Sequence, residues 1–303
     1  MKRQTETNIW VIIVTYNGSQ WIDACLDSLK ASVCPLTVLV VDNCSTDQTV
    51  SIIEQKYPEV RLIRNPTNTG FGQANNLGMK KALDENAEYI FLMNQDARIN
   101  PDAIQQLAEV AQAHSEFGII SPIHMNGKGT DLDFGFAFYT GLESLDSLHR
   151  AVGNQPLIEV PYINAAFWLI PANVLRITGG FDSLFFYCGE DVNLAQRIRY
   201  HGFKIGYVPA SLAYHDRENR PASHEKKVQI NIIYHLSESL NIFHSGFRAF
   251  LNGYAALWKR AAVGFLTFHW GDFYNYKLAS IRMFLQSCTI WKHRRESRQT
   301  NRW

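Results

Sequence analysis

The sequence predicts an α/β protein whose mostly parallel, Rossmann-like sheet is flanked by helices and followed by a helical C-terminal extension. Short apolar runs rich in β-branched residues alternate with segments of helical periodicity over about the first 120 residues. The loops between these segments are short, as in βαβ units. Charge sets the end of the chain apart, because residues 225–303 contain 12 Lys or Arg and 4 Asp or Glu, against 17 and 24 in residues 1–224. We therefore expect one domain over residues 1–223 and a helical extension over residues 224–303.

The first half is expected to contain four buried parallel strands separated by helices. The apolar runs that predict these strands cover residues 9–14, 37–41, 60–63 and 89–93. Apolar residues recur at helical spacing over residues 21–29 and 50–57, and a third helix is expected from Gly70 to about Glu85. Ser45-Thr46-Asp47 is expected to cap the second helix, and Pro101 to begin the helix after the fourth strand. A further strand is expected at residues 117–120.

The second half is less regular in sequence. Residues 121–161 contain Gly-rich and aromatic pieces, which favour hairpins or a mobile loop. A short helix is expected at residues 171–178, a longer helix at 190–200 and a strand at 203–208. Beyond about residue 223 the pattern predicts helices rich in aromatic and basic residues.

Cysteine usage and the N-terminal sequence favour a cytoplasmic protein. The five cysteines are odd in number and show no C-x-x-C spacing, so neither a disulfide framework nor a zinc site is expected. The first residues run into a strand without the apolar core and cleavage signature of a signal peptide. No stretch approaches the roughly 18 uninterrupted apolar residues that a spanning helix needs.

Polar clusters follow three of the expected strands at the points where those strands end. They are Thr15-Tyr16-Asn17, Asp42-Asn43 and Asn94-Gln95-Asp96, and Glu190-Asp191 opens a later helix. In open α/β sheets the ligand crevice lies outside the carboxyl ends of the strands. The sequence therefore predicts one site at this edge of the sheet.

The first two clusters do not match the common nucleotide motifs. Neither the G-x-G-x-x-G fingerprint after the first strand nor a P-loop is present. Asp42 stands where a carboxylate can accept hydrogen bonds from a base or a ribose. Asx residues also commonly shape turns and cap helices, and the sequence leaves both roles open for Asp42-Asn43 and Asp47.

The remaining clusters indicate a cation and a proton acceptor. A carboxylate at Asp96 can bind a hard divalent cation that neutralises a diphosphate, although a simple strand-end turn explains the cluster equally well. Glu190 and Asp191 emerge from apolar surroundings, which can raise their pKa values as a general base requires. Acidic residues at a helix start can also merely complement the helix dipole. His215 has both a structural and a metal-binding interpretation.

Taken in order, these segments resemble family-two glycosyltransferases of the GT-A fold, especially rhamnosyltransferase-like members. The resemblance covers about residues 8 to 216, and the order and spacing of its motifs are specific. The matching stretches are residues 11–17, 40–47, 65–76, 91–96, 179–182 and 190–194, with Arg197 and His215.

The resemblance implies an inverting transfer of a sugar from a nucleotide diphosphate donor to an acceptor hydroxyl. In that picture Asp191 is the general base, and Glu190 orients it or holds the acceptor. Asp96 and His215 lie on the side of a divalent cation, Mg²⁺ or Mn²⁺. The residues implied in nucleotide-sugar binding are Thr15, Tyr16, Asn17, Asp42, Asn43, Gly70, Gly72, Asn75, Asn94 and Gln95. Glycine at positions 70 and 72 is expected to permit close approach of the donor.

One position departs from the family pattern. Asn94 stands where many members carry a first Asp, so the motif has only one carboxylate and strict metal dependence is left open. This departure also favours an alternative from another class, a non-catalytic binding or assembly protein that keeps the fold. A nucleotidyltransferase would normally carry a Gly-rich basic loop after the first strand, and this sequence has none there.

The preferred interpretation is a bacterial-type transferase in cell-surface polysaccharide synthesis. Its favoured donor is dTDP-rhamnose, with a UDP-sugar as the second choice, and its acceptor is a saccharide or a lipid-linked sugar. No nucleic-acid-binding motif is recognised.

The C-terminal extension carries apolar and basic residues in separate groups. The residues that recur at helical spacing are Phe247, Phe250, Leu251, Tyr254, Leu257 and Trp258, and Lys259 and Arg260 follow them. Such a face can lie on the inner surface of the cell membrane. It can equally pack on the catalytic domain or on a partner subunit of a homo-oligomer, and the sequence favours neither.

Overall fold

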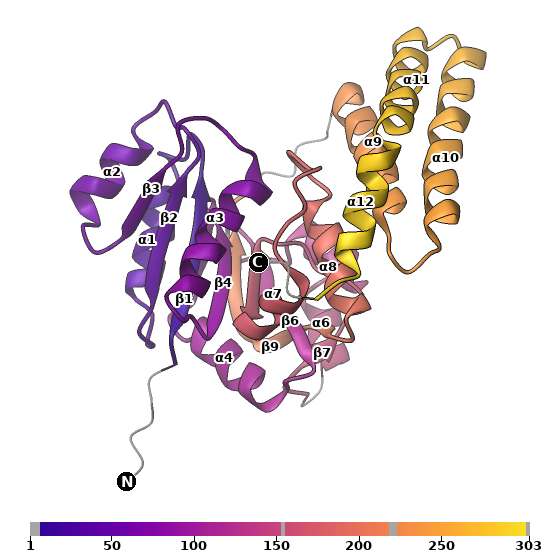
Figure 1. Ribbon diagram of the computed structural model, residues 1–303. Coiled ribbons are helices and arrows are strands. Elements are labelled where there is room, and N and C mark those ends of the chain that lie inside the picture. The colour runs from indigo at the N-terminus through magenta and orange to yellow at the C-terminus, as the bar shows by residue number, and fades with distance from the viewer. Residues whose placement is uncertain (1–6, 153–154, 218–222, 301–303) are drawn as a thin grey trace.

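The computed structural model describes residues 7–152, 155–217 and 223–300 (Figure 1). Its first half is a parallel sheet in the order β3-β2-β1-β4. These strands are β1 (Ile9–Thr15), β2 (Thr37–Asp42), β3 (Arg61–Arg64) and β4 (Tyr89–Asn94). The helices of this half are α1 (Ile22–Lys30), α2 (Thr49–Lys56), α3 (Phe71–Asp84) and α4 (Ala103–Ala113). Every strand and helix expected in residues 9–113 is therefore confirmed.

The sheet lies between two layers of helices, and alternate residues of its strands pack into two different apolar clusters. Trp10 and Ile12 of β1 pack with α3 on one face, whereas Val11 and Ile13 pack with α1 and α4 on the other. Burial on both faces explains why these strands are continuous apolar runs. The strands β1, β2 and β4 run parallel in register, so their polar ends at Thr15, Asp42 and Asn94 lie at one edge of the sheet.

The second half of the sheet is mixed. Strand β8 (Phe167–Pro171) lies antiparallel between β4 and β6 (Phe117–Asn126), and β9 (Lys204–His215) runs parallel to β6. Two short strands, β5 (Ala97–Ile99) and β7 (Ile158–Glu159), both pair antiparallel with β9. The GT-A arrangement of a sheet flanked by helices is confirmed, with its parallel order confined to β1–β4 and to the β6–β9 pair.

The expectation of hairpins or a mobile loop over residues 121–161 is wrong for part of that range. Helices α5 (Phe134–Thr140) and α6 (Leu145–Val152) form there. Asp133 begins α5, because its Oδ1 accepts hydrogen bonds from the N–H groups of Gly135 at 2.9 Å and Phe136 at 3.1 Å. Two glycines and four aromatic residues in residues 134–141 conceal this helix from a periodicity argument.

Several element boundaries also differ from the expected ones. Helix α4 begins two residues after Pro101, and α2 has Gln48 at its N-cap, although Asp47 still accepts a 3.0 Å hydrogen bond from the N–H of Thr49. Strand β6 continues to Asn126 and β9 to His215. Helices α7 (Ala172–Thr178) and α8 (Glu190–Tyr200) lie where the sequence predicts them.

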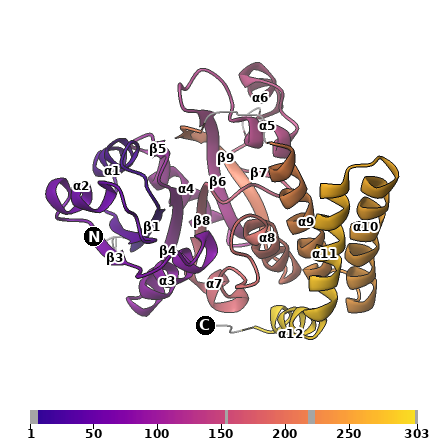
Figure 2. The same cartoon turned by 90° about the horizontal axis from the view of Figure 1, so that it is seen from above.

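The C-terminal region is helical, as predicted. It comprises α9 (His224–Leu240), α10 (Gly246–Leu266), α11 (Trp270–Leu285) and α12 (Ser287–Ser297). These helices lie together beside α8, at one end of the sheet (Figure 2). They enclose their own apolar cluster, which also includes Phe185 from the segment before α8. The members of this cluster are Phe185, Val228, Leu240, Leu257, Ala261, Tyr276, Met283 and Ile290.

Buried polar contacts fasten these helices to the sheet domain. His293 of α12 hydrogen-bonds Asp182 at 2.7 Å, and this Asp182 side chain is completely buried. Arg294 is also buried and donates to the carbonyl oxygens of Ser239, Asn241 and His244 at 2.6–3.0 Å. The His293 bond thus fastens α12 to the segment that precedes α8, whereas the Arg294 bonds join α12 to the end of α9 and the loop after it.

Candidate active site

Thr15 and Asp42 lie side by side at the carboxyl ends of β1 and β2, where their Cα atoms are register partners. The Thr15 hydroxyl donates to Asp42 Oδ1 at 3.0 Å, and the N–H of Ser45 donates to Oδ2 at 3.0 Å. Both Thr15 and Asp42 are buried. Each oxygen of Asp42 therefore has a partner within the chain, which gives this residue a turn-shaping role at least.

Tyr16 follows β1 and is held by the side chain of Gln95. The N–H of Tyr16 donates to Gln95 Oε1 at 2.9 Å, and Gln95 Nε2 donates to the carbonyl of Tyr16 at 3.2 Å. Gly18 leaves room for this amide, since a Cβ there would collide with Gln95. The Tyr16 side chain is 47% exposed. Two hydrogen bonds from Gln95 thus hold the backbone of Tyr16, while the Tyr16 ring is partly exposed.

Asn17 joins the loop after β1 to the loop after β2. It adopts a positive φ of 48°, which Asn tolerates better than most residues. Its N–H donates to Ser45 Oγ at 2.9 Å, and its Oδ1 accepts from the N–H of Thr46 at 2.9 Å. These bonds bring the first two predicted clusters into one structure.

Asn43 organises residues 65–70 with both ends of its amide. Its Oδ1 accepts from Asn65 Nδ2 at 3.1 Å and from the N–H of Thr69 at 3.0 Å. Its Nδ2 donates to Asn68 Oδ1 at 2.8 Å and to the carbonyl of Gly70 at 3.3 Å. Asn43 is therefore a positioning residue for this loop, with its hydrogen-bonding capacity largely used inside the chain.

Gly70 and Gly72 make room for other parts of the protein, and their role in the approach of a donor stays a prediction. Gly70 has φ of +83°, and a Cβ there would collide with the carbonyl oxygen of Phe186. A Cβ at Gly72 would lie 2.9 Å from the Cβ of Phe181. Asn75 is buried and its Nδ2 donates to the carbonyl of Phe71 at 3.0 Å, so it supports α3 itself.

Asn76 is a neighbouring residue whose role sequence reasoning missed. Its Nδ2 donates to the carbonyl of Phe181 at 2.9 Å, and its Oδ1 accepts from the N–H of Phe181 at 2.7 Å. This pair fastens α3 to the segment that leads into α8. Two consecutive asparagines, Asn75-Asn76, are the sequence feature that could have pointed to this role. Only the fold shows that the Asn76 amide contacts the backbone of Phe181.

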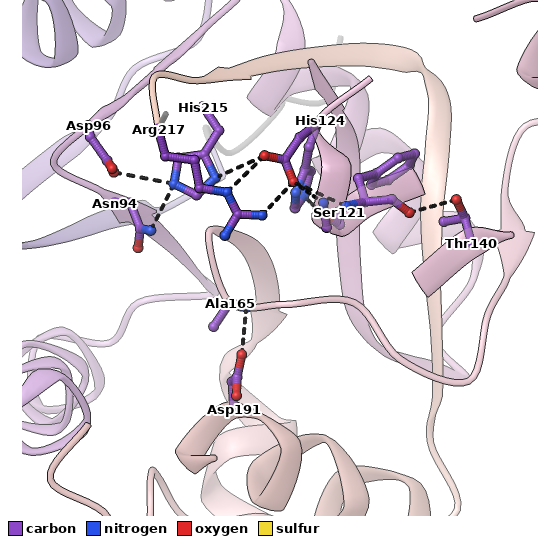
Figure 3. Close-up of polar contacts among 12 residues, drawn as sticks. Asn94, Asp96, Ser121, His124, Thr140, Ala165, Asp191, His215 and Arg217 are labelled. Carbon is purple, nitrogen blue, oxygen red and sulfur yellow. Dashed lines mark hydrogen bonds and ion pairs between the residues drawn. The ribbon is translucent and has the colours of Figure 1, made fainter. Parts of the chain in front are cut away.

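Asp96, Asn94 and His215 meet at the ends of β4 and β9 (Figure 3). His215 Nε2 lies 3.3 Å from Asp96 Oδ1 and 3.3 Å from Asn94 Nδ2. The pairing of β5 with β9 sets this geometry, because Ala97 and His215 are register partners. His215 is buried, whereas the Asp96 side chain is 23% exposed.

Asp133 and Arg217 form a second layer behind His215. Arg217 Nε and Nη2 donate to the two oxygens of Asp133 at 2.9 and 2.6 Å. Burial opposes ionisation of Asp133, but these guanidinium bonds and the charge of Arg217 hold its pKa below the usual value. His215 Nδ1 lies 3.9 Å from Asp133 Oδ2. Neither residue carries a sequence signal, because their meeting depends on α5 and β9.

The donor set at His215 suits a cation only in part. Asp96 and His215 Nε2 are two groups that can bind a divalent ion, and Asn94 Oδ1 is a buried oxygen without a partner. Over the three described ranges no three His, Cys, Asp or Glu side chains gather closely enough to hold a metal. A cation here would therefore need further oxygen ligands, such as those of a diphosphate.

Asp191 lies in the first turn of α8 with its carboxylate fixed on both sides. The Tyr162 hydroxyl donates to Oδ2 at 2.6 Å, the N–H of Ala165 lies 3.4 Å from Oδ2, and the N–H of Val192 donates to Oδ1 at 2.8 Å. Burial and the charge of Asp191 raise the pKa of Tyr162 well above its usual value, so Tyr162 stays a donor.

Glu190 is the more buried member of the pair. Burial, and then the neighbouring charge of Asp191, raises the pKa of Glu190 to about 7. Its Oε2 is buried without a hydrogen-bond partner. The raised pKa that the sequence predicted for this pair is therefore found at Glu190.

A cavity of about 780 Å³ connects the acidic pair to the His215 cluster. Four predicted site residues line it, namely Asn94, Glu190, Asp191 and His215, and so do Tyr162 and Arg217. The residues at the ends of β1 and β2 do not line it. The predicted site thus divides into a loop cradle beside β1 and β2 and a cavity between α8 and β9. A carboxylate that faces imidazole and amide groups across a cavity can deprotonate a bound hydroxyl.

Comparison with known proteins shows the family of the chain. The sequence profile of glycosyl transferase family 2 matches residues 10–175. The dTDP-rhamnosyl transferase RfbF of Shigella flexneri is 35% identical over 205 residues, which are 67% of each chain. The N-acetylglucosaminyl-diphospho-decaprenol L-rhamnosyltransferase of Mycobacterium tuberculosis is 27% identical over 250 residues, covering 71% of this chain and 79% of that one.

Solved structures show the same fold at low sequence identity. The mannosyltransferase PcManGT of Pyrobaculum calidifontis superposes with a TM-score of 0.60 at 18% identity, covering 97% of this chain and 88% of that one. TarS of S. aureus superposes with a TM-score of 0.58 at 19% identity, and the match spans 81% of this chain but 42% of TarS. Because the profile covers more than half of the residues, the chain belongs to glycosyl transferase family 2 and is a glycosyltransferase of the GT-A fold.

Proposed function

We propose that this transferase moves a rhamnosyl group from dTDP-rhamnose to an acceptor hydroxyl, with inversion, during cell-surface polysaccharide synthesis. The observation that carries the proposal is the cavity in which Asp191 faces Asn94 and His215, whose ring contacts Asp96. Two relatives whose names specify rhamnosyl transfer support the choice of sugar. The name of the Mycobacterium tuberculosis relative also supports an acceptor sugar carried on a lipid diphosphate.

Asp191 is the general base in this mechanism. The hydrogen bonds from Tyr162 and from the N–H of Val192 fix the carboxylate while leaving lone pairs for the acceptor hydroxyl. Asp191 takes the proton of that hydroxyl as its oxygen attacks the anomeric carbon of the donor. The bond from that carbon to the diphosphate oxygen breaks in the same step, so one displacement inverts the centre.

Glu190 lies beside the base and changes its charge near neutral pH. With a pKa of about 7, it is largely protonated in mildly acidic solution and then adds no second negative charge next to Asp191. We assign it to holding the acceptor, because it lines the cavity and its Oε2 has no partner in the unliganded chain.

Mg²⁺ or Mn²⁺ is the proposed cofactor, held by Asp96 and His215 next to the Asn94 amide. The structure of PcManGT contains GDP-Man and Mn²⁺, which supports a cation in this fold. Such an ion offsets the charge that develops on a departing diphosphate. Because Asp96 is the single carboxylate among these residues, the cation would need further oxygen ligands from the bound donor.

A second candidate donor is a UDP-sugar, since TarS has been crystallised with UDP and with UDP-GlcNAc. A non-catalytic role is favoured by Asn94, which replaces a carboxylate in the metal cluster. The hydrogen bonds that hold the Asp191 carboxylate favour catalysis instead, because a protein that only binds its ligand needs no fixed proton acceptor in the cavity.

The helices α10 and α11 supply a proposed contact with the cytoplasmic face of the membrane. None of the helices within the described ranges combines the length and apolar composition needed to cross a bilayer. The turn between α10 and α11 instead exposes large apolar side chains at Phe265, Leu266, Phe268 and Trp270. Lys259 and Lys277 flank it.

Figure 1 shows this turn at the upper right of the molecule, at the end toward which β1 runs. Exposed aromatic rings beside lysines suit an anionic lipid surface.

Substitutions at Asp191 and Asp96 should separate chemistry from metal-dependent binding. In Asp191→Asn we expect transfer to fall about 10³-fold, because the base is lost, while dTDP-rhamnose still binds more tightly with Mn²⁺. In Asp96→Asn the Mn²⁺ dependence of binding should disappear. Calorimetric titration and a transfer assay measure both effects, with Asp84→Asn on the outer surface of α3 as control. Retained turnover in Asp191→Asn would remove this residue as the base.

Glu190→Gln should stabilise the protein in a pH-dependent way. The folded state raises the pKa of Glu190 from 4.5 to about 7, so the folded state binds more protons than the unfolded state between these values. The free energy of unfolding should therefore fall by about 3 kcal/mol as pH rises through that window, and Glu190→Gln should not share this fall. Urea unfolding at pH 5 and pH 8 measures the difference. If the free energies of unfolding of the unmodified chain and of Glu190→Gln differed by the same amount at pH 5 and at pH 8, Glu190 would not have the raised pKa.

The membrane contact predicts binding to anionic vesicles. The full chain should sediment with phosphatidylcholine vesicles that contain phosphatidylglycerol and less with phosphatidylcholine alone. The double substitution Leu266→Glu and Phe268→Glu should abolish sedimentation, whereas Val33→Glu, an exposed apolar position after α1, should not. Dimers that dissociate on the double substitution, without vesicle binding by the unmodified chain, would identify this face as a subunit interface instead.

A further inference from the structure

The cavity next to Asp191 collects buried polar atoms that have no hydrogen-bond partner. Among the described residues, eleven buried side-chain nitrogen or oxygen atoms lack a partner, and six of them belong to residues that line this cavity. Three of the six belong to the acidic pair and to the cluster around His215. The other three belong to side chains that the proposed mechanism leaves without a role, namely Asn164, Gln196 and Ser237. Buried polar atoms in proteins are normally hydrogen-bonded, which makes a ligand the expected partner of these three oxygens.

Asn164 and Gln196 lie near the proposed base, on two different parts of the chain. Asn164 immediately precedes Ala165, whose N–H lies 3.4 Å from Asp191 Oδ2 (Figure 3). Gln196 lies on α8, five residues after Asp191 and so about 7.5 Å farther along the helix axis. A ligand that reaches Asp191 therefore meets both amides in the same cavity.

Ser237 comes from α9, which runs alongside α8. At the start of α8, Gly189 packs against Ile233, since a Cβ on this glycine would lie 2.8 Å from Ile233 Cγ2. At the end of α8, the rings of Tyr200 and Phe243 have their centroids 5.7 Å apart. Ser237 lies between Ile233 and Phe243 in the chain, so it is level with the middle of α8. It is buried and lines the cavity.

The chemistry of these three groups suits a neutral ligand with several hydroxyl groups. The unpartnered atoms are the amide oxygens of Asn164 and Gln196 and the hydroxyl oxygen of Ser237, and none of them is charged. An amide oxygen accepts hydrogen bonds, and a sugar hydroxyl can donate them. Ionised phosphate oxygens only accept hydrogen bonds, and an apolar chain makes none, so neither would satisfy these amide oxygens.

Two exposed aromatic rings add apolar surface to the same cavity. Phe138 of α5 and Tyr187, in the segment before α8, line the cavity and are 81% and 61% exposed. The C–H groups on one face of a pyranose ring can pack on such a ring, which removes apolar surface from water. Amide and hydroxyl groups beside exposed aromatic rings are the combination expected of a subsite for a sugar ring.

We propose that Asn164, Gln196 and Ser237 bind hydroxyl groups of the acceptor sugar other than the one that attacks the donor. Asn164 Oδ1 and Gln196 Oε1 accept hydrogen bonds from the sugar, and Ser237 Oγ donates or accepts one. The inference rests on the proposed transferase function and deepens it, because it names residues that determine which acceptor sugar is used. Through Ser237 the C-terminal extension takes a direct part in recognising the acceptor.

Sugar binding without turnover tests this subsite. The probes are the methyl pyranosides of glucose, galactose, mannose and N-acetylglucosamine, compared with 2-methoxytetrahydropyran, which has the same ring without hydroxyl groups. Saturation-transfer NMR on the full chain gives their dissociation constants. We expect at least one pyranoside to bind at least about tenfold more tightly than the bare ring, because it adds hydrogen bonds to the cavity. Equal affinities for all the pyranosides and the bare ring would overturn the proposal.

Substitutions in the subsite should change binding without changing stability. Gln196→Leu and Ser237→Ala should each weaken the tightest-binding pyranoside about fivefold and leave the bare ring unaffected. Because these oxygens have no partner in the unliganded chain, neither substitution should lower the melting temperature, whereas loss of a structural hydrogen bond would lower it.

The matched control is Gln106→Leu on α4. The Oε1 atom of Gln106 is also buried without a partner, but this residue does not line the cavity. The control should keep the pyranoside affinity of the unmodified chain. If Gln196→Leu and Ser237→Ala also kept that affinity, these residues would not contact the sugar.

Competition separates the acceptor sugar from the donor sugar. In Asp191→Asn, which should bind the donor without turning it over, saturating dTDP-rhamnose with Mn²⁺ should leave the pyranoside bound. Displacement of the pyranoside would assign these contacts to the donor sugar and overturn the proposal. Failure of the unmodified chain to turn over dTDP-rhamnose would overturn the proposed function instead, and that result is independent of the pyranoside affinities.

Discussion

The pairing of β5 with the end of β9 holds the site together. Strand β9 begins on the far side of the sheet, and its last residue reaches Asp96 only because Ala97 and His215 are register partners. A backbone bond from the N–H of Asp216 to the carbonyl of Asp96, at 2.7 Å, extends the same pairing. This short antiparallel contact brings a histidine from position 215, which lines the cavity, beside a carboxylate from position 96.

The parallel half of the fold could be predicted because the strands β1, β2 and β4 are largely buried on both faces. Such strands leave continuous apolar runs, and their polar ends mark the edge where Thr15, Asp42 and Asn94 lie. The position of Asp191 in the first turn of α8 followed from the acidic pair alone. These features depend on local sequence, so a reading of local sequence finds them.

The remaining features depend on contacts between distant segments. Helix α5 begins at Asp133, whose partner Arg217 is 84 residues away, and no local pattern predicts that pair. At Gly70 and Gly72 a Cβ would meet Phe186 and Phe181, two partners that the local sequence does not reveal. Asn43 holds residues 65–70 through its amide, which is also not apparent from the residues around it. In each case the sequence marks the residue as unusual, but it does not tell which distant residue the side chain or backbone contacts.

In the proposed mechanism a sugar is transferred in a single displacement, with Asp191 as the base and the departing diphosphate beside His215. The stereochemistry of the product tests this most directly. Carbon NMR of the product, with one-bond carbon–proton couplings at the anomeric centre, gives its configuration relative to the dTDP-rhamnose supplied. Inverted configuration is the expected result, and retained configuration would mean that transfer does not occur by this single displacement.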